Sequence, residues 1–533
     1  MTQTRSDSFD FIDLGPRPGT DDPAITVIIA AYAMERELPR TLMSLSRSYQ
    51  NATESLHYDV LLVDNGSPNR PNIDQLKQIC PNLSGALIRK SPGRSPVAGL
   101  NGAIQQARGS IVGVMIDAAR ILSPGIIASA AEIITPESQT VVGTYGFHLG
   151  PDVQMESVKH GYGPELEDKL LEQIGFPADG YRLFEISSLA GSSSRGWYSR
   201  ISESNLFFTT KRNLLRLGGF DERFASEGGG FANLEIWDRL VSDPLDQVVM
   251  LLGEGTFHQV HGGTATNRGS EEKHVLWRNE YAAITGRDYR CPSYRFMNDG
   301  AIESSDLMRR FTDTTRPSSI GLPGVIFSEA QLTAIQNGVM NRSFYRRVPF
   351  FKSPFCQAIY GKLISDLRPG SVIEIGSHSG GSALFFADRM AAEGLVPNLL
   401  CIDILDRMAP LAKRSPEIRF IQLSAEHLGR IYDIVDQLPK PWLVVEDADH
   451  TFQLCVTVFE SFRTLLTPGD MYVVEDGIVA YLGEAYRRYD SGPLRAIEYI
   501  LANYGDRFAI DRDSCDLYGL NATWSPNGFL RVI

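Results

Sequence analysis

The residues between 442 and 477 constrain the fold of this chain more than any other stretch, because they predict a strand, a helix and a second strand. Two apolar runs, 442–445 and 471–474, flank a segment whose large apolar residues recur at spacings of three and four. Each run ends in acidic residues. If the two strands are parallel neighbours, their acids meet at the carboxyl edge of one sheet, where open α/β sheets bind ligands.

Three acidic side chains at this edge, Asp447, Glu475 and Asp476, would repel one another unless a cation compensates their charge. A hard divalent cation such as Mg²⁺ takes carboxylate oxygens as ligands, so a metal site explains the grouping. His450, three residues after Asp447, is then placed to act as a general base. The spacing fits equally well with solvated acids that cap the following helices, and it does not choose between the two interpretations.

A second pattern lies upstream of the acidic strands and predicts a nucleotide-binding βαβ unit. An apolar run at 371–375 leads into a glycine turn with Gly376 and Gly380, and the next apolar run ends at Asp403. The glycines allow the backbone to approach a ligand, and the strand-end acid can bind ribose hydroxyls. The spacing Gly-x-x-x-Gly differs from the dinucleotide motif Gly-x-Gly-x-x-Gly, which favours S-adenosylmethionine over NAD. A Rossmann-type strand without this ligand is the alternative interpretation.

Residues 350–533 resemble the metal-dependent O-methyltransferases of the cephalosporin-hydroxylase-like family, which includes methyltransferases of macrolide sugars and of rhamnose in glycolipids. The matching sequences are EIGSHSGGSA, CID, the D-x-x-H motif, VVEDG and GPLRAIEYIL. Because the family name also covers proteins called hydroxylases, a hydroxylase or binding role remains an alternative for this half. The resemblance implies Mg²⁺ on Asp447, Glu475 and Asp476, His450 as the base, and S-adenosylmethionine at Glu374, Gly376, Gly380 and Asp403.

The first half of the chain predicts another parallel sheet, because apolar strands again alternate with helical patterns. The strands are expected at 25–32, 60–64 and 110–116, and acids follow or end the last two, at Asp64 and Asp117. The expected fold class is therefore α/β, with two doubly wound domains.

This half resembles the inverting glycosyltransferases of family 2, which have the GT-A fold. The matching sequences are VIIAAYAMERELPRTLMSL, VLLVDNGSP, a helix around Asn101, MIDAARILSPG and GGFDERF. The resemblance implies a nucleotide-sugar donor whose base lies between Ala31 and Tyr32 and hydrogen-bonds Asp64, with Asp117 beside the ribose and diphosphate. A doubly wound fold with another ligand is the alternative.

Two positions depart from the pattern of that family. The D-x-D motif, whose last acid holds a metal, reads DAA from Asp117 onward, and Asn233 stands where the family has its catalytic aspartate. Since Asn233 cannot accept a proton at neutral pH, Glu235 is the expected general base and Glu227 is a weaker candidate. These departures leave open that this half is a non-catalytic sugar-binding module.

The missing metal ligand has a candidate replacement in two histidines. His258 and His261 stand three residues apart among glycines, and two such imidazoles can ligate a metal. Together with Asp117 they are expected to hold Mn²⁺ or Mg²⁺. In the alternative interpretations the histidines only hydrogen-bond loop backbone, or Arg120 neutralises the diphosphate without a metal.

Length and composition bound the domain organisation. The 533 residues exceed one ordinary domain. The net charge of −13 argues against a nucleic-acid partner. No apolar run approaches the ~20 residues that span a bilayer, and no secretory signal is expected at the start of the chain. The six cysteines are scattered, which predicts free thiols in a reducing cytoplasm. The predicted segments are a flexible N-terminal arm at 1–23, a GT-A domain at 24–290, a connector at 291–345 and a methyltransferase domain at 346–533.

The sequence thus predicts a cytoplasmic enzyme with two activities. The first half transfers a sugar with inversion from a nucleotide sugar to a glycan or glycoside acceptor. The second half methylates a hydroxyl, expected on a sugar, in the biosynthesis of surface glycans or glycosylated natural products. The main alternative is a methyltransferase that carries a non-catalytic sugar-binding module. The oligomeric state, including a homo-oligomer, stays open.

Overall fold

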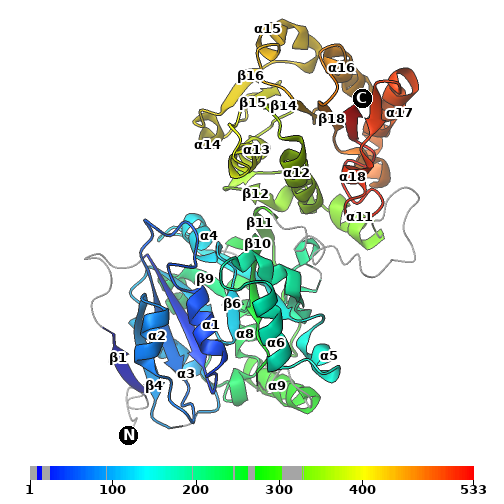
Figure 1. The fold of residues 1–533 in the computed structure, drawn as a ribbon. Helices are drawn as coiled ribbons and strands as arrows, with labels where there is room; N and C mark the ends of the chain where they lie inside the picture. The colour runs from blue at the N-terminus through cyan, green and yellow to red at the C-terminus, as the bar shows by residue number, and fades with distance from the viewer. Residues whose placement is uncertain are drawn as a thin grey trace. The chain divides into compact units, whose positions relative to one another are not determined.

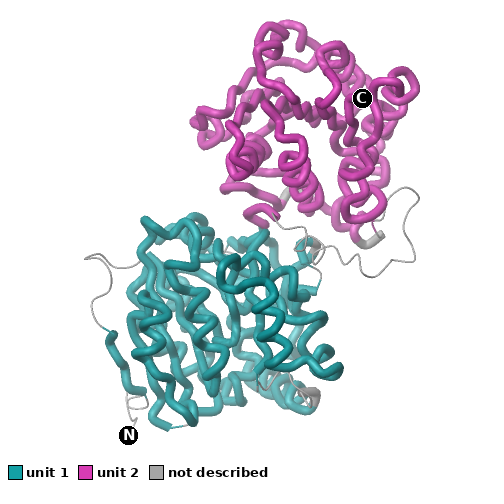
Figure 2. The backbone as a smooth tube through the Cα atoms, viewed as in Figure 1, with its two compact units in different colours: residues 1–297 teal, residues 298–533 magenta. Residues whose placement is uncertain are grey.

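The computed structural model describes residues 9–14, 24–91, 93–194, 196–243, 247–261, 270–302, 327 and 329–533. The chain forms two compact units, Met1–Met297 and Asn298–Ile533 (Figure 2). Their boundary falls inside the expected connector, of which 303–326 and 328 lie outside the described residues. Among the described helices, none combines the length and the apolar character that crossing a membrane requires.

Unit 1 is built on a sheet whose central strands are parallel (Figure 1). Its order is β1 (Phe9–Asp13), β4 (Leu83–Arg89), β3 (Tyr58–Asp64), β2 (Ile25–Ala31), β5 (Ile111–Met115), β9 (Phe207–Thr210), β7 (Thr140–Leu149) and β10 (Gln247–His258), while β6 (Arg120–Leu122) pairs with β10 and β8 (Ser187–Leu189) with β7. Every residue of β2 and β3 is buried. Strands covered on both faces read as nearly continuous apolar runs, which is why the sequence predicted them.

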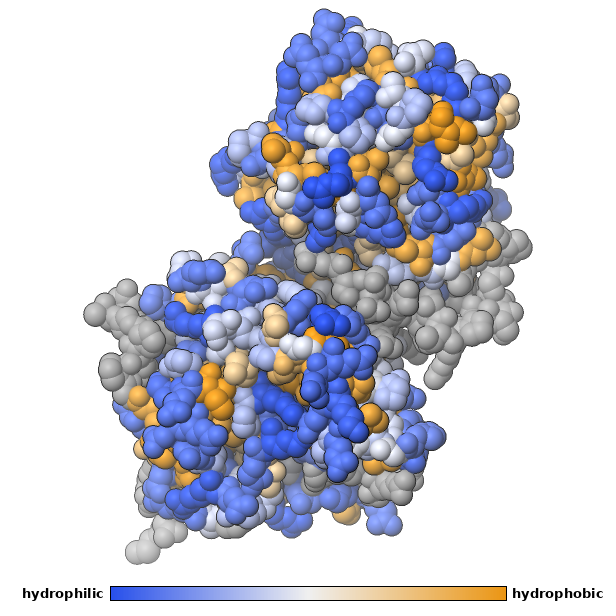
Figure 3. All heavy atoms as spheres, in the orientation of Figure 1, coloured by the Kyte–Doolittle hydropathy of each residue, from blue (hydrophilic) through white to orange (hydrophobic). Residues whose placement is uncertain are grey.

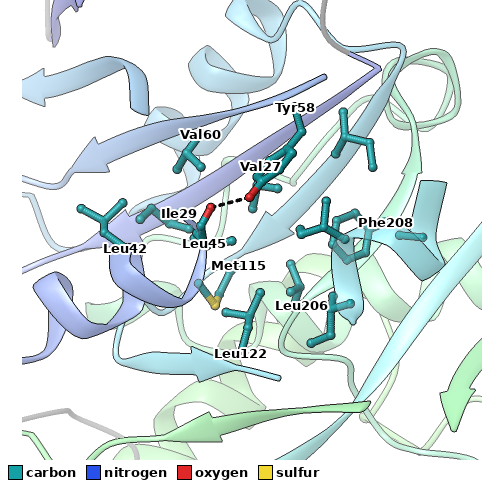
Figure 4. Packing of buried hydrophobic residues seen from close by; sticks show 14 of the residues in the cluster. Val27, Ile29, Leu42, Leu45, Tyr58, Val60, Met115, Leu122, Leu206 and Phe208 are labelled. Carbon is teal, nitrogen blue, oxygen red and sulfur yellow. Dashed lines mark hydrogen bonds between the residues drawn. The ribbon is translucent and has the colours of Figure 1, made fainter. Parts of the chain in front are cut away.

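Helices cover this sheet through a core of buried apolar side chains (Figure 4). Leu42 and Leu45 belong to the same cluster as Val27 of β2 and Val60 of β3. The hydroxyl of buried Tyr58 donates to the Leu45 carbonyl at 2.9 Å, so this polar atom keeps a partner inside the core. The helices of unit 1 are α1 (Glu37–Ser44), α2 (Ile73–Ile79), α3 (Val97–Gln106), α4 (Ile126–Ile133), α5 (Gln154–Lys159), α6 (Pro164–Gln173), α7 (Lys211–Arg216), α8 (Ala232–Ser242) and α9 (Ser270–Thr285).

Part of the expected flexible arm is a strand. Residues Phe9–Asp13 form β1, which pairs antiparallel with β4 and sets Phe9 opposite Arg89. This correction applies to the arm's central segment, whereas 1–8 and 15–23 lie outside the described residues. The pairing covers the outer edge of β4, and an unpaired edge would otherwise offer its N–H and C=O groups to other chains.

Unit 2 has a second mixed sheet with the order β16 (Ile418–Gln422), β15 (Leu399–Asp403), β14 (Ser371–Ile375), β17 (Trp442–Glu446), β18 (Met471–Val474), β20 (Phe529–Val532) and β19 (Phe508–Ile510). The first five strands are parallel, and β20 runs antiparallel to both of its neighbours. The strand order reverses at β14, which lies between β15 and β17. Ligands bind at such a switch point in open α/β sheets. The two sheets confirm the α/β class with two doubly wound domains.

Helices and short strands complete unit 2. On the face of the molecule that Figure 3 shows, hydrophilic residues are interspersed with hydrophobic ones. Five of the six cysteines are buried and Cys291 is exposed, all as free thiols. The helices are α11 (Glu329–Gln336), α12 (Pro354–Leu367), α13 (Gly381–Ala392), α14 (Pro410–Lys413), α15 (Tyr432–Val435), α16 (Phe452–Phe462), α17 (Gly492–Tyr504) and α18 (Arg512–Cys515), and the short strands are β11 (Phe296–Gly300, beginning in unit 1), β12 (Ser343–Tyr345) and β13 (Val348–Pro349).

Candidate functional site

The carboxyl edge of the unit 2 sheet carries a cluster of acidic side chains and an imidazole. Because β17 and β18 are parallel neighbours, the residues after both strands come together. Asp447, His450 and Asp476 each offer one ligand atom, and these atoms lie within 4.8 Å of one another. His450 Nε2 lies 3.4 Å from Asp476 Oδ2. The expected meeting of strand-end acids is therefore confirmed, with the histidine among them.

Glu475, the remaining expected metal ligand, is directed toward other side chains. Lys352 Nζ lies 2.8 Å from Glu475 Oε1 and 2.9 Å from Asp447 Oδ2, which makes it a bridge between the two carboxylates. The hydroxyl of Tyr360 also donates to Glu475 Oε1, and that of Ser525 donates to Oε2 at 2.6 Å. None of these three partners was predicted from the sequence. The one feature that pointed to a buried charge was the lysine within the apolar stretch FFKSPF.

The electrostatics of this cluster fit a divalent cation. Burial raises the pKa of Asp476 to about 7, with His450 opposing the shift and Asp447 adding to it. Burial lowers the pKa of His450, but the carboxylates of Asp476 and Asp447 outweigh it and the net shift is upward. Asp447 and Asp476 thus present carboxylate oxygens beside the His450 imidazole, while Lys352 contacts Asp447 and Glu475. Mg²⁺ prefers such oxygen ligands, so this donor set suits it.

Backbone strain is concentrated around the same edge. Asp476, His450 and His378 have φ angles of 54°, 51° and 44°. A residue with a Cβ rarely adopts this left-handed region, and such conformations cluster where a site requires a particular side-chain direction.

Gly376 and Gly380 shape the loop after β14. Gly376 has a φ of 99°, and a Cβ there would lie 2.0 Å from the backbone oxygen of Asp447. Gly380, with a φ of 79°, starts α13, and a Cβ there would lie 2.8 Å from the Ala412 side chain. Gly376 therefore allows the loop after β14 to lie against the end of β17, and Gly380 allows the start of α13 to lie against α14.

Two expected cofactor-binding acids flank this loop. Glu374 is fully buried, and neither carboxylate oxygen has a partner in hydrogen-bonding geometry among the described residues. Burial raises the pKa of Glu374 to about 7, with Lys352 opposing the shift. Asp403 is half-buried and accepts the backbone N–H groups of His378 and Leu405, both at 2.9 Å. An unpartnered buried carboxylate is unusual, and it fits a ligand with a cationic group, such as the ammonium of S-adenosylmethionine.

Unit 1 contains a second cluster with metal-ligand spacing. Asp117, His258 and His261 offer ligand atoms that lie within 4.8 Å of one another. Asp117 Oδ2 lies 3.0 Å from His258 Nε2 and 3.7 Å from His261 Nε2, and the two imidazole nitrogens are 3.3 Å apart. Asp117 comes from the end of β5 and His258 is the last residue of β10. The sheet thus brings together the three residues that the sequence predicted as ligands.

The protonation state of His258 makes this cluster suitable for a cation. His258 Nδ1 lies 2.7 Å from Gln154 Oε1, which can only accept, so Nδ1 carries the hydrogen. Burial and the charge of Arg120 lower the pKa of His258 to about 4, against the attraction of Asp117. In the neutral ring Nε2 is an acceptor, and it faces a second acceptor on Asp117. A divalent cation between them removes this repulsion, and imidazole with carboxylate is a suitable ligand set.

Two of the residues expected to bind the nucleotide, Ala31 and Asp64, lie in one pocket. Ala31 and Asp64 line a pocket of about 260 Å³ together with Met34 and other residues of 34–39 and 67–76. Asp64 accepts the Ser67 hydroxyl at 2.5 Å, and Tyr32 is 43% exposed beside Ala31. Ala119, where the family has an acid, is fully buried. An acid at this position would therefore lie in the interior.

The structure gives no support to Glu235 as a base. Its two oxygens pair with Arg239, at 2.5 Å to Nε and 2.7 Å to Nη2, and Arg239 also donates to the carbonyls of Leu217 and Gly219. Arg239 ties α8 to the turn after α7, and Glu235 holds the guanidinium in place, which makes Glu235 structural. The weaker candidate Glu227 pairs with Lys273 at 3.2 Å and has a side chain that is 53% exposed.

Comparisons with known proteins match each unit to one family. Residues 337–533 match the model for Rhamnosyl O-methyltransferase/CmcI, and residues 26–191 match Glycosyl transferase family 2. Both resemblances inferred from the sequence are thereby confirmed.

Individual relatives differ in how much of the chain they cover. A Rhamnosyl O-methyltransferase of Mycobacterium leprae (strain TN) is 30% identical over 200 residues, which is 36% of this chain and 85% of the relative. An 8-demethyl-8-alpha-L-rhamnosyl tetracenomycin-C 2'-O-methyltransferase of Streptomyces olivaceus is 26% identical over 139 residues, 25% of this chain and 35% of the relative. A solved mannosyltransferase from Pyrobaculum calidifontis, in complex with GDP-mannose and Mn²⁺, is 18% identical with a TM-score of 0.30 and covers 52% of this chain and 68% of its own.

Proposed function

This chain belongs to the rhamnosyl O-methyltransferase/CmcI family through residues 337–533, and we propose that it methylates a sugar hydroxyl in unit 2 and transfers a sugar from a nucleotide sugar in unit 1. The observation that supports the first activity is the cluster of Asp447, His450 and Asp476 beside the glycine loop after β14. The two methyltransferase relatives are named for rhamnosyl groups, so a rhamnosyl residue is the proposed methyl acceptor.

In the methyl transfer, Glu374 and Asp403 hold the cofactor while Asp447 and Asp476 hold the metal. S-adenosylmethionine, when bound, supplies the methyl group, and Mg²⁺ makes the acceptor hydroxyl more acidic. His450, whose Nε2 lies 3.4 Å from Asp476 Oδ2, takes the proton from that hydroxyl. Lys352 keeps Glu475 and Asp447 in place by bridging them.

In the glycosyl transfer, the pocket at Ala31 and Asp64 receives the nucleotide base. Asp117, His258 and His261 hold a divalent cation that compensates the charge of the diphosphate when both are bound. We place both reactions in the cytoplasm, in the assembly of a methylated surface glycan or glycosylated natural product. The six free cysteines agree with a reducing compartment.

The methyl-transfer proposal is tested by incubating the full chain with S-adenosylmethionine, Mg²⁺ and either p-nitrophenyl α-L-rhamnoside or p-nitrophenyl β-D-glucoside. Mass spectrometry should detect a methylated rhamnoside and little methylated glucoside. Methylation of neither glycoside would refute sugar methylation, and a preference for the glucoside would refute the rhamnosyl acceptor.

Cofactor binding should depend on Asp403. Removing its carboxylate in Asp403→Ala takes away an acceptor for the ribose hydroxyls, and we expect binding of S-adenosylmethionine to weaken by roughly 1–3 kcal/mol. Isothermal titration calorimetry on the full chain measures this change. The matched control is Asp406→Ala, because Asp406 is exposed and pairs with Lys413. Equal affinities for Asp403→Ala and the wild type would contradict the assignment.

A further inference from the structure

Glu203 lies in the loop before β9, and neighbouring residues fix its backbone. The hydroxyl of Ser204 accepts the backbone N–H of Thr144 in β7 at 2.9 Å and donates to the Leu206 carbonyl at 2.7 Å. Ser204 is fully buried, whereas Glu203 is half-buried and so remains open to a ligand. These hydrogen bonds fix the backbone next to the Glu203 carboxylate and attach the loop to β7, the strand that contains His148.

The carboxylate of Glu203 has a neutral partner. Asn233 Nδ2 donates to Glu203 Oε2 at 2.8 Å and to the Ser204 carbonyl at 3.2 Å. Within the described parts of the chain, this is the one hydrogen bond of the Glu203 side chain, and the side chain enters no ion pair. A neutral amide orients a carboxylate without neutralising its charge, which leaves the other oxygen able to accept a proton.

Asn233 is the geometric link between Glu203 and the reaction, because it stands where family 2 glycosyltransferases have their catalytic aspartate and it donates to Glu203 at 2.8 Å. A buried cation, Arg120, lies opposite His258 in the pairing of β6 with β10. Its guanidinium is buried, and Nε and Nη1 have no hydrogen-bond partner among the described residues. Burial lowers the pKa of Arg120, and the charges of Asp117 and Glu203 both oppose that shift. Two unpartnered buried N–H groups fit an anionic ligand, such as the diphosphate of the donor.

Four other carboxylates near α8 and α9 are bound to cations or to backbone. The three ion-paired ones would have to lose a cation before they could take a proton, whereas Glu280 accepts through Oε1 alone and its buried Oε2 has no partner among the described residues. The four are Glu235 with Arg239, Asp238 with Arg287, Glu227 with Lys273, and Glu280 with the backbone N–H groups of Ala225 and Ser226.

We infer that Glu203 is the general base of the glycosyl transfer, an inference that rests on the function proposed for unit 1. Its carboxylate takes the proton of the acceptor hydroxyl while that oxygen bonds to the anomeric carbon of the donor. The bond from this carbon to the diphosphate oxygen breaks, and the nucleoside diphosphate leaves with the electron pair. Glu203 then returns the proton to solvent. Asn233 is a positioning residue that orients Glu203.

The test uses water as the acceptor, so that no acceptor needs to be known. The full chain is incubated with Mn²⁺ and dTDP-rhamnose, GDP-mannose or UDP-glucose, and release of the nucleoside diphosphate is followed. For the donor that the wild type hydrolyses, Glu203→Gln should lower kcat by roughly 100-fold. Its donor affinity and melting temperature should stay within error of the wild type.

Glu227→Gln and Glu235→Gln are the matched controls, since each replaces another glutamate of the same unit by the same residue. Both should keep kcat within a few-fold of the wild type. Unchanged turnover in Glu203→Gln, or an equal loss in Glu235→Gln without loss of folding, would overturn the inference and leave the glycosyltransferase intact. Donor binding without hydrolysis in the wild type would instead overturn the proposed function, and the role of Glu203 with it.

Discussion

Asp447→Asn is expected to lower the rate of methyl transfer about 10⁴-fold, because it removes a metal ligand and one of the two carboxylates that Lys352 bridges. The substitution keeps the shape of the side chain, so the loss reports charge and ligation. Melting temperature should change little, since Lys352 retains its contact with Glu475. The rate is measured with S-adenosylmethionine and the rhamnoside as substrates.

Asp449→Asn is the matched control for this variant. Asp449 is exposed and lies two residues further along the same loop, and it should keep the wild-type rate. Chelation of divalent cations should reproduce the effect of Asp447→Asn in the wild type and leave the variant unchanged. Full activity after exhaustive chelation would exclude a role for the metal, and a loss that is confined to His450→Gln would assign the chemistry to the base alone.

The position of this site could be predicted because it depends on local patterns. Apolar runs that end in acids predicted β17 and β18, and a glycine turn after an apolar run predicted the loop after β14. Parallel strands carry their carboxyl ends to one edge, so the grouping of Asp447 and Asp476 followed from the order of elements. The strand Phe9–Asp13 was missed because only residues 9–11 alternate between apolar and acidic residues, which is too short a strand signal.

The direction of individual side chains could not be predicted in the same way. Glu475 and Asp476 are consecutive, but both follow the end of β18, and Asp476 has left-handed backbone with a φ of 54°, so the alternation of an extended strand does not set their directions. Asp476 lies in the cluster with Asp447 and His450, whereas Glu475 pairs with Lys352. The partner of Glu475 lies 123 residues away in the sequence, so no spacing indicated it.

Glu235 differs from Glu475, because its ion-pair partner could have been predicted from the sequence. Arg239 stands four residues later, and oppositely charged residues at this spacing face each other on a helix. Glu203, in contrast, lies 30 residues before Asn233, with β9 and α7 between them, and only the fold brings the two together.

The largest effect expected in unit 1 is that of Asp117→Asn combined with His258→Gln. We expect hydrolysis of the donor nucleotide sugar to fall about 10³-fold, because the cation that compensates the leaving diphosphate loses two ligands. Each single variant should show a smaller loss. Mn²⁺ binding, followed by electron paramagnetic resonance in the absence of any donor, should weaken in parallel and gives a readout that is independent of turnover.

His160→Gln is the control for these variants, because His160 is exposed and hydrogen-bonds only within its own turn, to the carbonyl of Glu156. It should bind Mn²⁺ as the wild type does. If the double variant binds Mn²⁺ normally but no longer hydrolyses the donor, the cluster acts on the diphosphate without a metal, and the unpartnered guanidinium of Arg120 becomes the group that compensates the charge. If both properties survive, the facing acceptors of Asp117 and His258 share a proton, and the metal assignment of unit 1 is wrong.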